Sequence, residues 1–330
     1  DTTAPVIADI SPVASTWLNS TSVTISGSVT ELHLASVTIA GTSATISGAN
    51  FSAVVTLAEG ANSIDIIAQD NAGNSAIVSH ALKVDTTQPV VTITSPLDGT
   101  YTKEASVAIS GQFTETNIAT ITVNGLSAVI SGSTYSANVP LGAEGNNPIV
   151  VTATDLSGNS GSAQISVHKD TTLPLVAITN PTDGSFTNST TITVSGTVTE
   201  TNLATLTING VAATVTGNTF SADIPLNIEG SNTVTAVVTD LAGNAEQTQI
   251  AGLRDTTVPV ATITSPSAGT FTSGSTVTVS GEFTETNVNT IAVNGVAATI
   301  SGSTYSAVVP VNNEGLNTLT VTVTDLANNS

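Results

Sequence analysis

Asp85-Thr86-Thr87-Gln88-Pro89 is one of four copies of a pattern that divides the chain into nearly equal parts. The others are Asp1-Thr2-Thr3-Ala4-Pro5, Asp170-Thr171-Thr172-Leu173-Pro174 and Asp255-Thr256-Thr257-Val258-Pro259, at intervals of 84, 85 and 85 residues. Two β-branched residues followed closely by proline make an extended, stiff connector. The spacing predicts a tandem array of four repeats: residues 1–84, 85–169, 170–254 and 255–330.

Within the second repeat, short runs of alternating apolar and polar residues are separated by turn residues, with no helical period. Asn124-Gly125 is a strong hairpin signal that recurs as Asn209-Gly210 and Asn294-Gly295, and the first repeat has Gly41-Thr42 there. We expect seven strands, A to G, at residues 90–94, 106–113, 118–123, 127–130, 134–139, 148–154 and 162–167. The fold class predicted is all-β, a tandem array of seven-stranded immunoglobulin-like β-sandwiches.

The fourth repeat stops at the turn after strand F, Asp325-Leu326-Ala327-Asn328-Asn329-Ser330, so strand G is missing. Methionine is absent, even at position 1. We expect the sequence to be a window from a longer array. The alternative is a strand donated by a neighbouring molecule, although the chain starts at the connector with no spare strand of its own.

The charge balance limits the class of partner. There are 24 acidic and 4 basic residues, a formal charge of −20, so the chain lacks the cations that a nucleic acid would need. An acidic or cation-binding surface is the natural interpretation. No apolar run approaches the roughly 20 residues of a membrane span.

Four acidic positions recur in every repeat. They are the connector Asp (Asp1, Asp85, Asp170, Asp255), the B–C loop Glu (Glu31, Glu115, Glu200, Glu285), the E–F loop Glu (Glu59, Glu144, Glu229, Glu314) and the F–G turn Asp (Asp70, Asp155, Asp240, Asp325). Alternating strand directions place the B–C and F–G loops beside the connector of their own repeat, and the E–F loop beside the next connector. We therefore expect the following groups to converge: Glu59, Asp85, Glu115 and Asp155; Glu144, Asp170, Glu200 and Asp240; Glu229, Asp255, Glu285 and Asp325.

Gathered carboxylates repel one another unless a cation lies among them. A cluster of oxygen ligands in loops suits Ca²⁺, which takes about 6–8 oxygens, better than the strictly octahedral Mg²⁺. The side chains of Asn117, Asn202 and Asn287 are further candidate ligands. Zinc is not expected, because cysteine is absent and the three histidines are scattered.

The alternative is that these acids are turn formers whose counter-charges are Lys83, Lys169 and Arg254, which precede the connectors at −2, −1 and −1.

The motifs Asp-Thr-Thr-x-Pro, Thr-Glu-Thr-Asn, Glu-Gly and Asp-Leu-x-Gly-Asn at this period resemble the bacterial Ig-like repeats of giant calcium-dependent surface adhesins. The resemblance covers the whole chain and implies Ca²⁺ at the junctions of a stiffened extracellular stalk. Two positions depart from the pattern: His33 replaces the Asn, which weakens a first site made of Asp1, Glu31 and Asp70, and Asn328 replaces the turn glycine.

No constellation for catalysis is found, since His33, His80 and His168 hold no common position and a site repeated in every domain is more readily structural. We expect a non-enzymatic, calcium-rigidified extracellular or cell-surface spacer whose partners are its neighbouring repeats and possibly copies of itself. Two alternatives stay open: a self-assembling filament or sheath subunit, and an accessory or ligand-binding array of a secreted enzyme.

Overall fold

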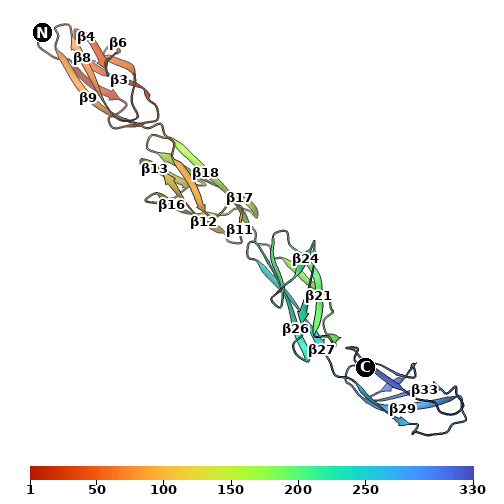
Figure 1. Ribbon diagram of the computed structural model, residues 1–330. Coiled ribbons are helices and arrows are strands. Elements are labelled where there is room, and N and C mark those ends of the chain that lie inside the picture. Colours follow the sequence, from red (N-terminus) through yellow and green to blue (C-terminus); the bar gives the residue numbers. More distant parts are fainter. The chain divides into compact units, whose positions relative to one another are not determined.

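The computed structural model describes all residues, 1–330, as β-strands, turns and connectors without a helix. It divides into two compact units, Asp1–Asp170 and Thr171–Ser330. Each unit contains two repeats, and each repeat is built from two sheets (Figure 1). The prediction of an all-β array of Ig-like sandwiches is confirmed. No helix long and apolar enough to cross a membrane is present.

The strands of the first unit follow one plan in both repeats. In the first repeat they are β1 (Val6–Ser11), β2 (Trp17–Leu18), β3 (Ser22–Thr30), β4 (Leu34–Ile39), β5 (Thr42–Ser43), β6 (Thr45–Ser47), β7 (Asn50–Thr56), β8 (Gly60–Asp70) and β9 (Ser75–Val84). In the second they are β10 (Val90–Ser95), β11 (Thr100–Thr102), β12 (Ser106–Thr114), β13 (Ile118–Val123), β14 (Leu126–Ser127), β15 (Val129–Ser131), β16 (Thr134–Pro140), β17 (Gly145–Asp155) and β18 (Ser160–Lys169).

The second unit repeats the plan. The third repeat has β19 (Leu175–Asn180), β20 (Ser185–Thr187), β21 (Thr191–Thr199), β22 (Leu203–Ile208), β23 (Val211–Ala212), β24 (Thr214–Thr216), β25 (Thr219–Pro225), β26 (Gly230–Asp240) and β27 (Ala245–Arg254). The fourth has β28 (Val260–Ser265), β29 (Thr276–Thr284), β30 (Val288–Val293), β31 (Val296–Ala297), β32 (Thr299–Ser301), β33 (Thr304–Pro310) and β34 (Val321–Asp325).

In the second repeat, one sheet has the order β10-β12-β16-β15 and the other β11-β18-β17-β13-β14. All pairings are antiparallel except β11 with β18, which is parallel. The sequence did not predict β11, which is only three residues long. The strand expected at 127–130 differs too. β14 pairs with β13 and β15 pairs with β16, because the chain changes sheets at Ala128.

The hairpin tip of the first repeat is Ala40-Gly41, with φ values of 49° and 78°, rather than Gly41-Thr42. It therefore has the left-handed backbone of Asn124-Gly125, with φ values of 47° and 80°, without the asparagine. The two central residues of such a hairpin both need positive φ.

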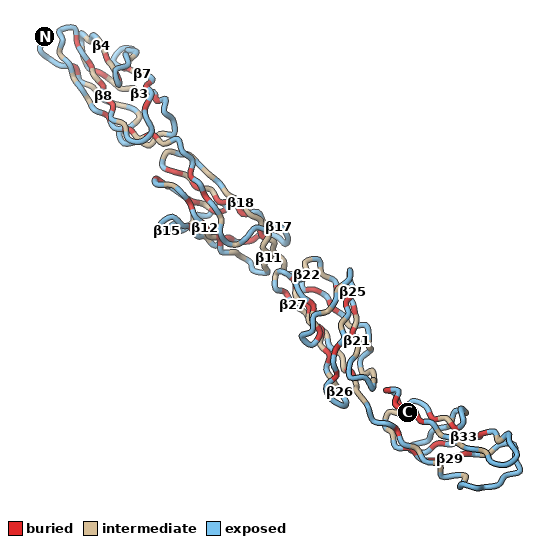
Figure 2. The backbone as a smooth tube through the Cα atoms, viewed as in Figure 1, coloured by how far each residue is buried: buried red, intermediate tan, exposed pale blue.

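Each repeat has a core of its own between its sheets, seen in Figure 2 as buried segments along the inner strands. A glycine and an aromatic ring face each other across two strands in every core, as with Gly111 and Tyr135. A Cβ at Gly111 would overlap the Thr92 carbonyl and the Tyr135 hydroxyl. That hydroxyl donates to the Thr92 oxygen at 2.8 Å, and burial raises the pKa of Tyr135 to about 12.

In the fourth repeat the second sheet has only β31, β30 and β34. Its strand F is five residues long, against eleven for β8, β17 and β26. Phe271, at the position that forms β2, β11 or β20 elsewhere, is fully exposed. In the other three repeats both of these segments pair with strand G.

Candidate metal centres at the repeat junctions

The connector residue Asp85 is held through its backbone and its side chain. Its N–H donates to Leu18 O at 2.9 Å in the first repeat, and its carbonyl accepts from Asn159 Nδ2 at 2.7 Å in the second. Its Oδ1 accepts from the Thr87 N–H at 2.9 Å, and its Oδ2 from Asn117 Nδ2 at 2.8 Å. The carboxylate is therefore fixed toward the loops of the second repeat.

Two further carboxylates meet it there. Asp85, Glu115 and Asp155 each offer an oxygen, and these atoms lie within 4.8 Å of one another. Glu115 Oε1 accepts from the N–H groups of Thr116 and Asn117 at 2.6 and 3.1 Å, and these bonds leave Oε2 unused. The B–C loop thus folds around its own glutamate and presents the second oxygen.

Asp155 is 2% exposed and closes the F–G turn. Its Oδ1 accepts from the N–H groups of Ser157 and Asn159, both at 2.8 Å, while Oδ2 accepts only Asn159 Nδ2, at 2.8 Å. Oδ1 is saturated by these bonds, and Oδ2 keeps one lone pair for another partner. The residue is both a turn former and a candidate ligand.

Asn117 provides a neutral oxygen at the same place. The residue is 8% exposed, its Nδ2 is engaged with Asp85, and its Oδ1 is buried without a hydrogen-bond partner. Buried polar atoms are nearly always paired in folded proteins, so the unpaired Oδ1 of Asn117 is a further candidate ligand for a cation.

The fourth repeat builds the same arrangement. Asp255, Glu285 and Asp325 offer oxygens within 4.8 Å of one another, and Asn287 Oδ1 again has no partner. Hydrogen bonds from the Thr257 N–H and from Asn287 hold the pKa of Asp255 below its usual value. The Asn329 side chain donates to Asp255 O at 2.8 Å.

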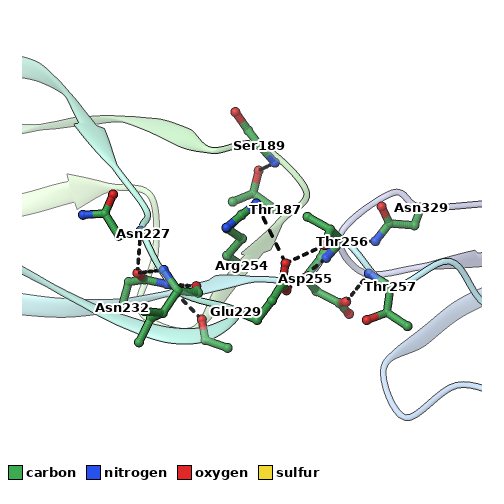
Figure 3. Close-up of polar contacts among 12 residues, drawn as sticks. Thr187, Ser189, Asn227, Glu229, Asn232, Arg254, Asp255, Thr256, Thr257 and Asn329 are labelled. Atoms are coloured by element: carbon green, nitrogen blue, oxygen red, sulfur yellow. Dashed lines mark hydrogen bonds and ion pairs between the residues drawn. The ribbon is translucent and has the colours of Figure 1, made fainter.

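The E–F glutamates lie beside these groups, not within them. Glu59 Oε1 accepts from the Thr86 N–H at 2.7 Å. Figure 3 shows the equivalent Glu229 contacting Thr256, with a 3.2 Å bond from the Thr256 N–H, and facing Arg254 at 3.9 Å. Each glutamate thus links its own repeat to the threonine that directly follows the next connector aspartate.

The remaining predicted site residues are placed differently. Asp1 and Glu31 group with His33, and Asp70 is outside that group. Glu144 and Asp170 belong to the first compact unit, whereas Glu200 and Asp240 belong to the second. Glu144 faces Lys169 at 4.0 Å, and Glu200 accepts from the Thr201 and Asn202 N–H groups. Convergence at that junction stays a prediction.

If the acids are turn formers, their expected counter-charges are Lys83, Lys169 and Arg254. These three basic residues do not have equivalent partners. Lys169 and Arg254 face the E–F glutamates of their own repeats. Lys83 instead lies over the Trp17 ring, 4.7 Å from its centroid.

Sequence reasoning missed the asparagine that ends the F–G turn. Asn74, Asn159 and Asn329 each donate to the carbonyl of their connector aspartate, at 3.3, 2.7 and 2.8 Å. The recurrence of Asn four residues after the turn Asp was the available signal. These residues fasten the connector without contributing charge.

Comparison with known families gives four successive matches to one domain. The model of the family described as "Glucodextranase, domain B" matches residues 5–86, 89–171, 174–253 and 259–330. The chain belongs to this family. It is an array of four glucodextranase B domains, which confirms the expected Ig-like tandem repeats; calcium and an adhesin role stay predictions.

Among curated proteins, Bacillopeptidase F of Bacillus subtilis (strain 168) is 36% identical over 166 residues, covering 49% of this chain and 11% of that protein. The chain thus spans about a tenth of that relative's length. Among solved structures, a tetra-tandem repeat in the extending region of a large adhesion protein is 22% identical, covers 99% of this chain and 96% of its own, and has a TM-score of 0.35. Titin domains I67–I69 are 11% identical, with coverage of 76% and 98% and a TM-score of 0.45.

Proposed function

We propose that this array of B domains is an extracellular spacer whose junctions bind Ca²⁺. The observation that carries the proposal is the group formed by Asp85, Glu115, Asp155 and the orphaned Oδ1 of Asn117. Because the same set recurs around Asp255, the geometry belongs to the repeat and not to one loop.

The available oxygens suit calcium in number and kind. Both oxygens of Asp85 accept one hydrogen bond each, so each keeps a lone pair. With Glu115 Oε2, Asp155 Oδ2 and Asn117 Oδ1, five protein oxygens keep a lone pair for a cation, and water completes the roughly 6–8 oxygens that Ca²⁺ takes. The cation offsets the repulsion of three carboxylates.

Binding at Asp85 acts on the connector because that residue is shared. Its N–H is bonded to the first repeat and its carboxylate to loops of the second. A cation on that carboxylate therefore restricts the backbone between two sandwiches. Loss of the cation restores the repulsion and loosens the connector.

The first test is calorimetric titration of the full chain with Ca²⁺ after treatment with chelator. We expect Glu115→Gln with Glu285→Gln to remove the part of the heat that comes from the groups around Asp85 and Asp255, because each change removes a charge from one group. Glu104→Gln, at an exposed position, is the control. Glu59→Gln should weaken binding much less, because Glu59 contacts Thr86.

Small-angle scattering of the same proteins then tests stiffening. We expect a single extended form in millimolar Ca²⁺ and a broader distribution of lengths in chelator, with Mg²⁺ failing to restore the first. Heat without a change in scattering would leave a calcium site that does not stiffen the array. No heat at all would remove the calcium proposal.

A second candidate is an accessory array of a secreted enzyme. The names of the family and of Bacillopeptidase F support it, since both refer to enzymes. The test is the sequence of the intact parent polypeptide isolated from its source. A catalytic domain beside this array would favour the accessory role, and further repeats on both sides would favour the spacer.

A further inference from the structure

The first three repeats share a parallel strand pairing that joins the first part of the repeat to its last strand. β2 pairs with β9, β11 with β18, and β20 with β27. The strand that opens each of these repeats, β1, β10 or β19, belongs to the other sheet. The parallel pairing, here called the terminal ladder, is therefore the direct strand-to-strand link between the beginning of the repeat and its end.

In the second repeat the terminal ladder joins the three residues of β11 to the end of β18. Before β11, the Gly99 N–H donates to Ser166 O at 2.8 Å. After β11, the ladder closes with a bond from the Asp170 N–H to Thr102 O at 2.9 Å. Asp170 is the next connector aspartate, so this last bond is made by the residue at which the chain leaves the repeat.

Tension along the chain loads this ladder in shear. The chain enters the second repeat beside the start of β18, where Asn159 Nδ2 donates to Asp85 O, and it leaves at the end of β18. A pull on the two connectors therefore drives β11 and β18 past each other along their own axes. Because the bonds of a parallel pair are evenly spaced between the strands, they are loaded together and not one after another.

Two aspartates fasten the last strand where the terminal ladder begins. Asp98 Oδ1 accepts from the Ser166 N–H, and Asp183 Oδ1 accepts from the Ala251 N–H, both at 2.7 Å. The glycine after each aspartate donates to the carbonyl of the same residue, at 2.8 and 2.9 Å. Both main-chain groups of Ser166 and of Ala251 are thus held by one turn, and the bond to the carboxylate is stronger than a bond between neutral groups.

The first repeat has the same turn without the carboxylate. Ser15 stands in place of the glycine, with a φ of 68° against 78° for Gly99, and its N–H donates to Ala81 O at 2.7 Å. Ala14 stands in place of the aspartate, and its methyl group cannot accept a bond from the Ala81 N–H. The backbone of the turn is kept, whereas the side-chain bond is absent.

We propose that the terminal ladder bears tension between the two ends of each of these repeats, and that Asp98 and Asp183 strengthen it. The bond to each aspartate must break before the last strand can slide, so it adds to the barrier that force has to overcome. The ladder lies within single repeats and does not involve the proposed calcium sites. All of the following measurements are therefore made in excess chelator.

The test applies force to one repeat at a time within the full chain. The chain has no cysteine, so two introduced cysteines define where it is pulled. Gln88→Cys and Leu173→Cys, at exposed connector positions, enclose the second repeat. At constant force we expect Asp98→Ala to shorten the time to unfolding roughly tenfold, which corresponds to about 1.4 kcal/mol. An unchanged unfolding time would overturn the role of Asp98.

A second direction of pull separates resistance to force from ordinary stability. With handles at Gln88→Cys and Ser127→Cys, the latter at an exposed position in β14, the end of β18 carries no load. The second repeat should then unfold sooner, and D98A should unfold as fast as wild type. Equal unfolding times of wild type in the two directions would show that the terminal ladder does not bear the load. An equal effect of D98A in both directions would also refute the proposal.

The first repeat allows the reverse substitution. Handles at Ala4→Cys and Gln88→Cys enclose it, and both positions are exposed. We expect Ala14→Asp to lengthen its unfolding time, because the backbone of the turn already matches that of the second repeat. An unchanged time would contradict strengthening of the ladder by a carboxylate at this position.

The third repeat, held between Leu173→Cys and Val258→Cys, supplies a matched control. Asp223 also accepts a side-chain bond, from the Thr193 hydroxyl at 2.6 Å, but in the sheet that does not contain the terminal ladder. We expect Asp183→Ala to shorten the unfolding time and Asp223→Ala to change it much less. Equal effects of these two substitutions would overturn the assignment of resistance to the terminal ladder.

Discussion

Asp70 shows how one carboxylate organises a turn. Its Oδ1 accepts from the N–H groups of Ala72 and Asn74, both at 2.8 Å, and its Oδ2 from Asn74 Nδ2 at 2.7 Å. The bond from the Asn74 side chain, with the backbone N–H groups, holds the pKa of Asp70 below its usual value. Asp70 lies outside the first carboxylate group. Substitutions at Asp70 therefore test how much this aspartate stabilises its turn, separately from any metal binding.

A depressed pKa means that the unfolded chain binds the proton more readily than the folded one. The stabilisation from Asp70 is therefore complete above the carboxyl's ordinary pKa and is lost as pH falls through the folded value. We expect Asp70→Asn to lower the urea midpoint of the first repeat at pH 7, and to lower it much less in strong acid.

Trp17, the only tryptophan, lies in the first repeat, so its fluorescence reports that repeat's unfolding. The control is Asp65→Asn. Asp65 also accepts a side-chain hydrogen bond, from the Ser79 hydroxyl, but it lies at an exposed position in a strand. If the difference in urea midpoint between wild type and D70N were the same at pH 7 and in strong acid, it would contradict the role assigned to the Asp70 carboxylate.

The residues also show what sequence can and cannot place. Strand direction alone predicted that the connector, B–C and F–G carboxylates meet, and they do so around Asp85 and Asp255, whereas Asp70 lies outside the first group. Glu59 was expected among them, but its side chain bonds to the Thr86 N–H instead. Loop direction brings a residue to one end of a sandwich, whereas the partner of its side chain depends on backbone details that no repeat pattern encodes.

At the scale of the element, strands with strong alternation were predicted best. β13 was predicted at its observed bounds, residues 118–123. β17 begins at Gly145, three residues before the prediction, because its first residues pair with the end of β18. β11 and the change of sheet at Ala128 depend on tertiary pairing, so local pattern does not reveal them.

The F–G turn acts as a fastening element through Asn159. We expect Asn159→Ala to destabilise the second repeat by about 1–2 kcal/mol, because its side-chain bonds to Asp155 and Asp85 are lost. The Thr87 N–H, bonded to Asp85, should also exchange faster with solvent.

Measured in chelator, this effect is independent of any cation. Asn146→Ala, at an exposed position, is the matched control and should change neither quantity. Unchanged exchange at Thr87 in N159A would show that the turn does not fasten the connector.

At the scale of the whole molecule, four separate cores replace one. We expect Ile25→Ala, at a fully buried position, to destabilise the first repeat by about 2–5 kcal/mol. The unfolding transition reported by Trp17 fluorescence should move to a lower temperature. The calorimetric unfolding temperatures of the other repeats should not change.

Val54→Ala, at a position 61% exposed in the same repeat, should leave the Trp17 transition unchanged within about 0.5 kcal/mol. If I25A lowered every transition together, the repeats would form one cooperative block.

Because no core residue is shared between repeats, the gene can gain or lose whole repeats without disturbing any sandwich. The four connectors share the pattern Asp-Thr-Thr-x-Pro, so an exchange between two copies of the connector would join one complete repeat to another. The length of such a protein is thus free to drift among related strains, while the sequence of each repeat stays under the constraint of its own core.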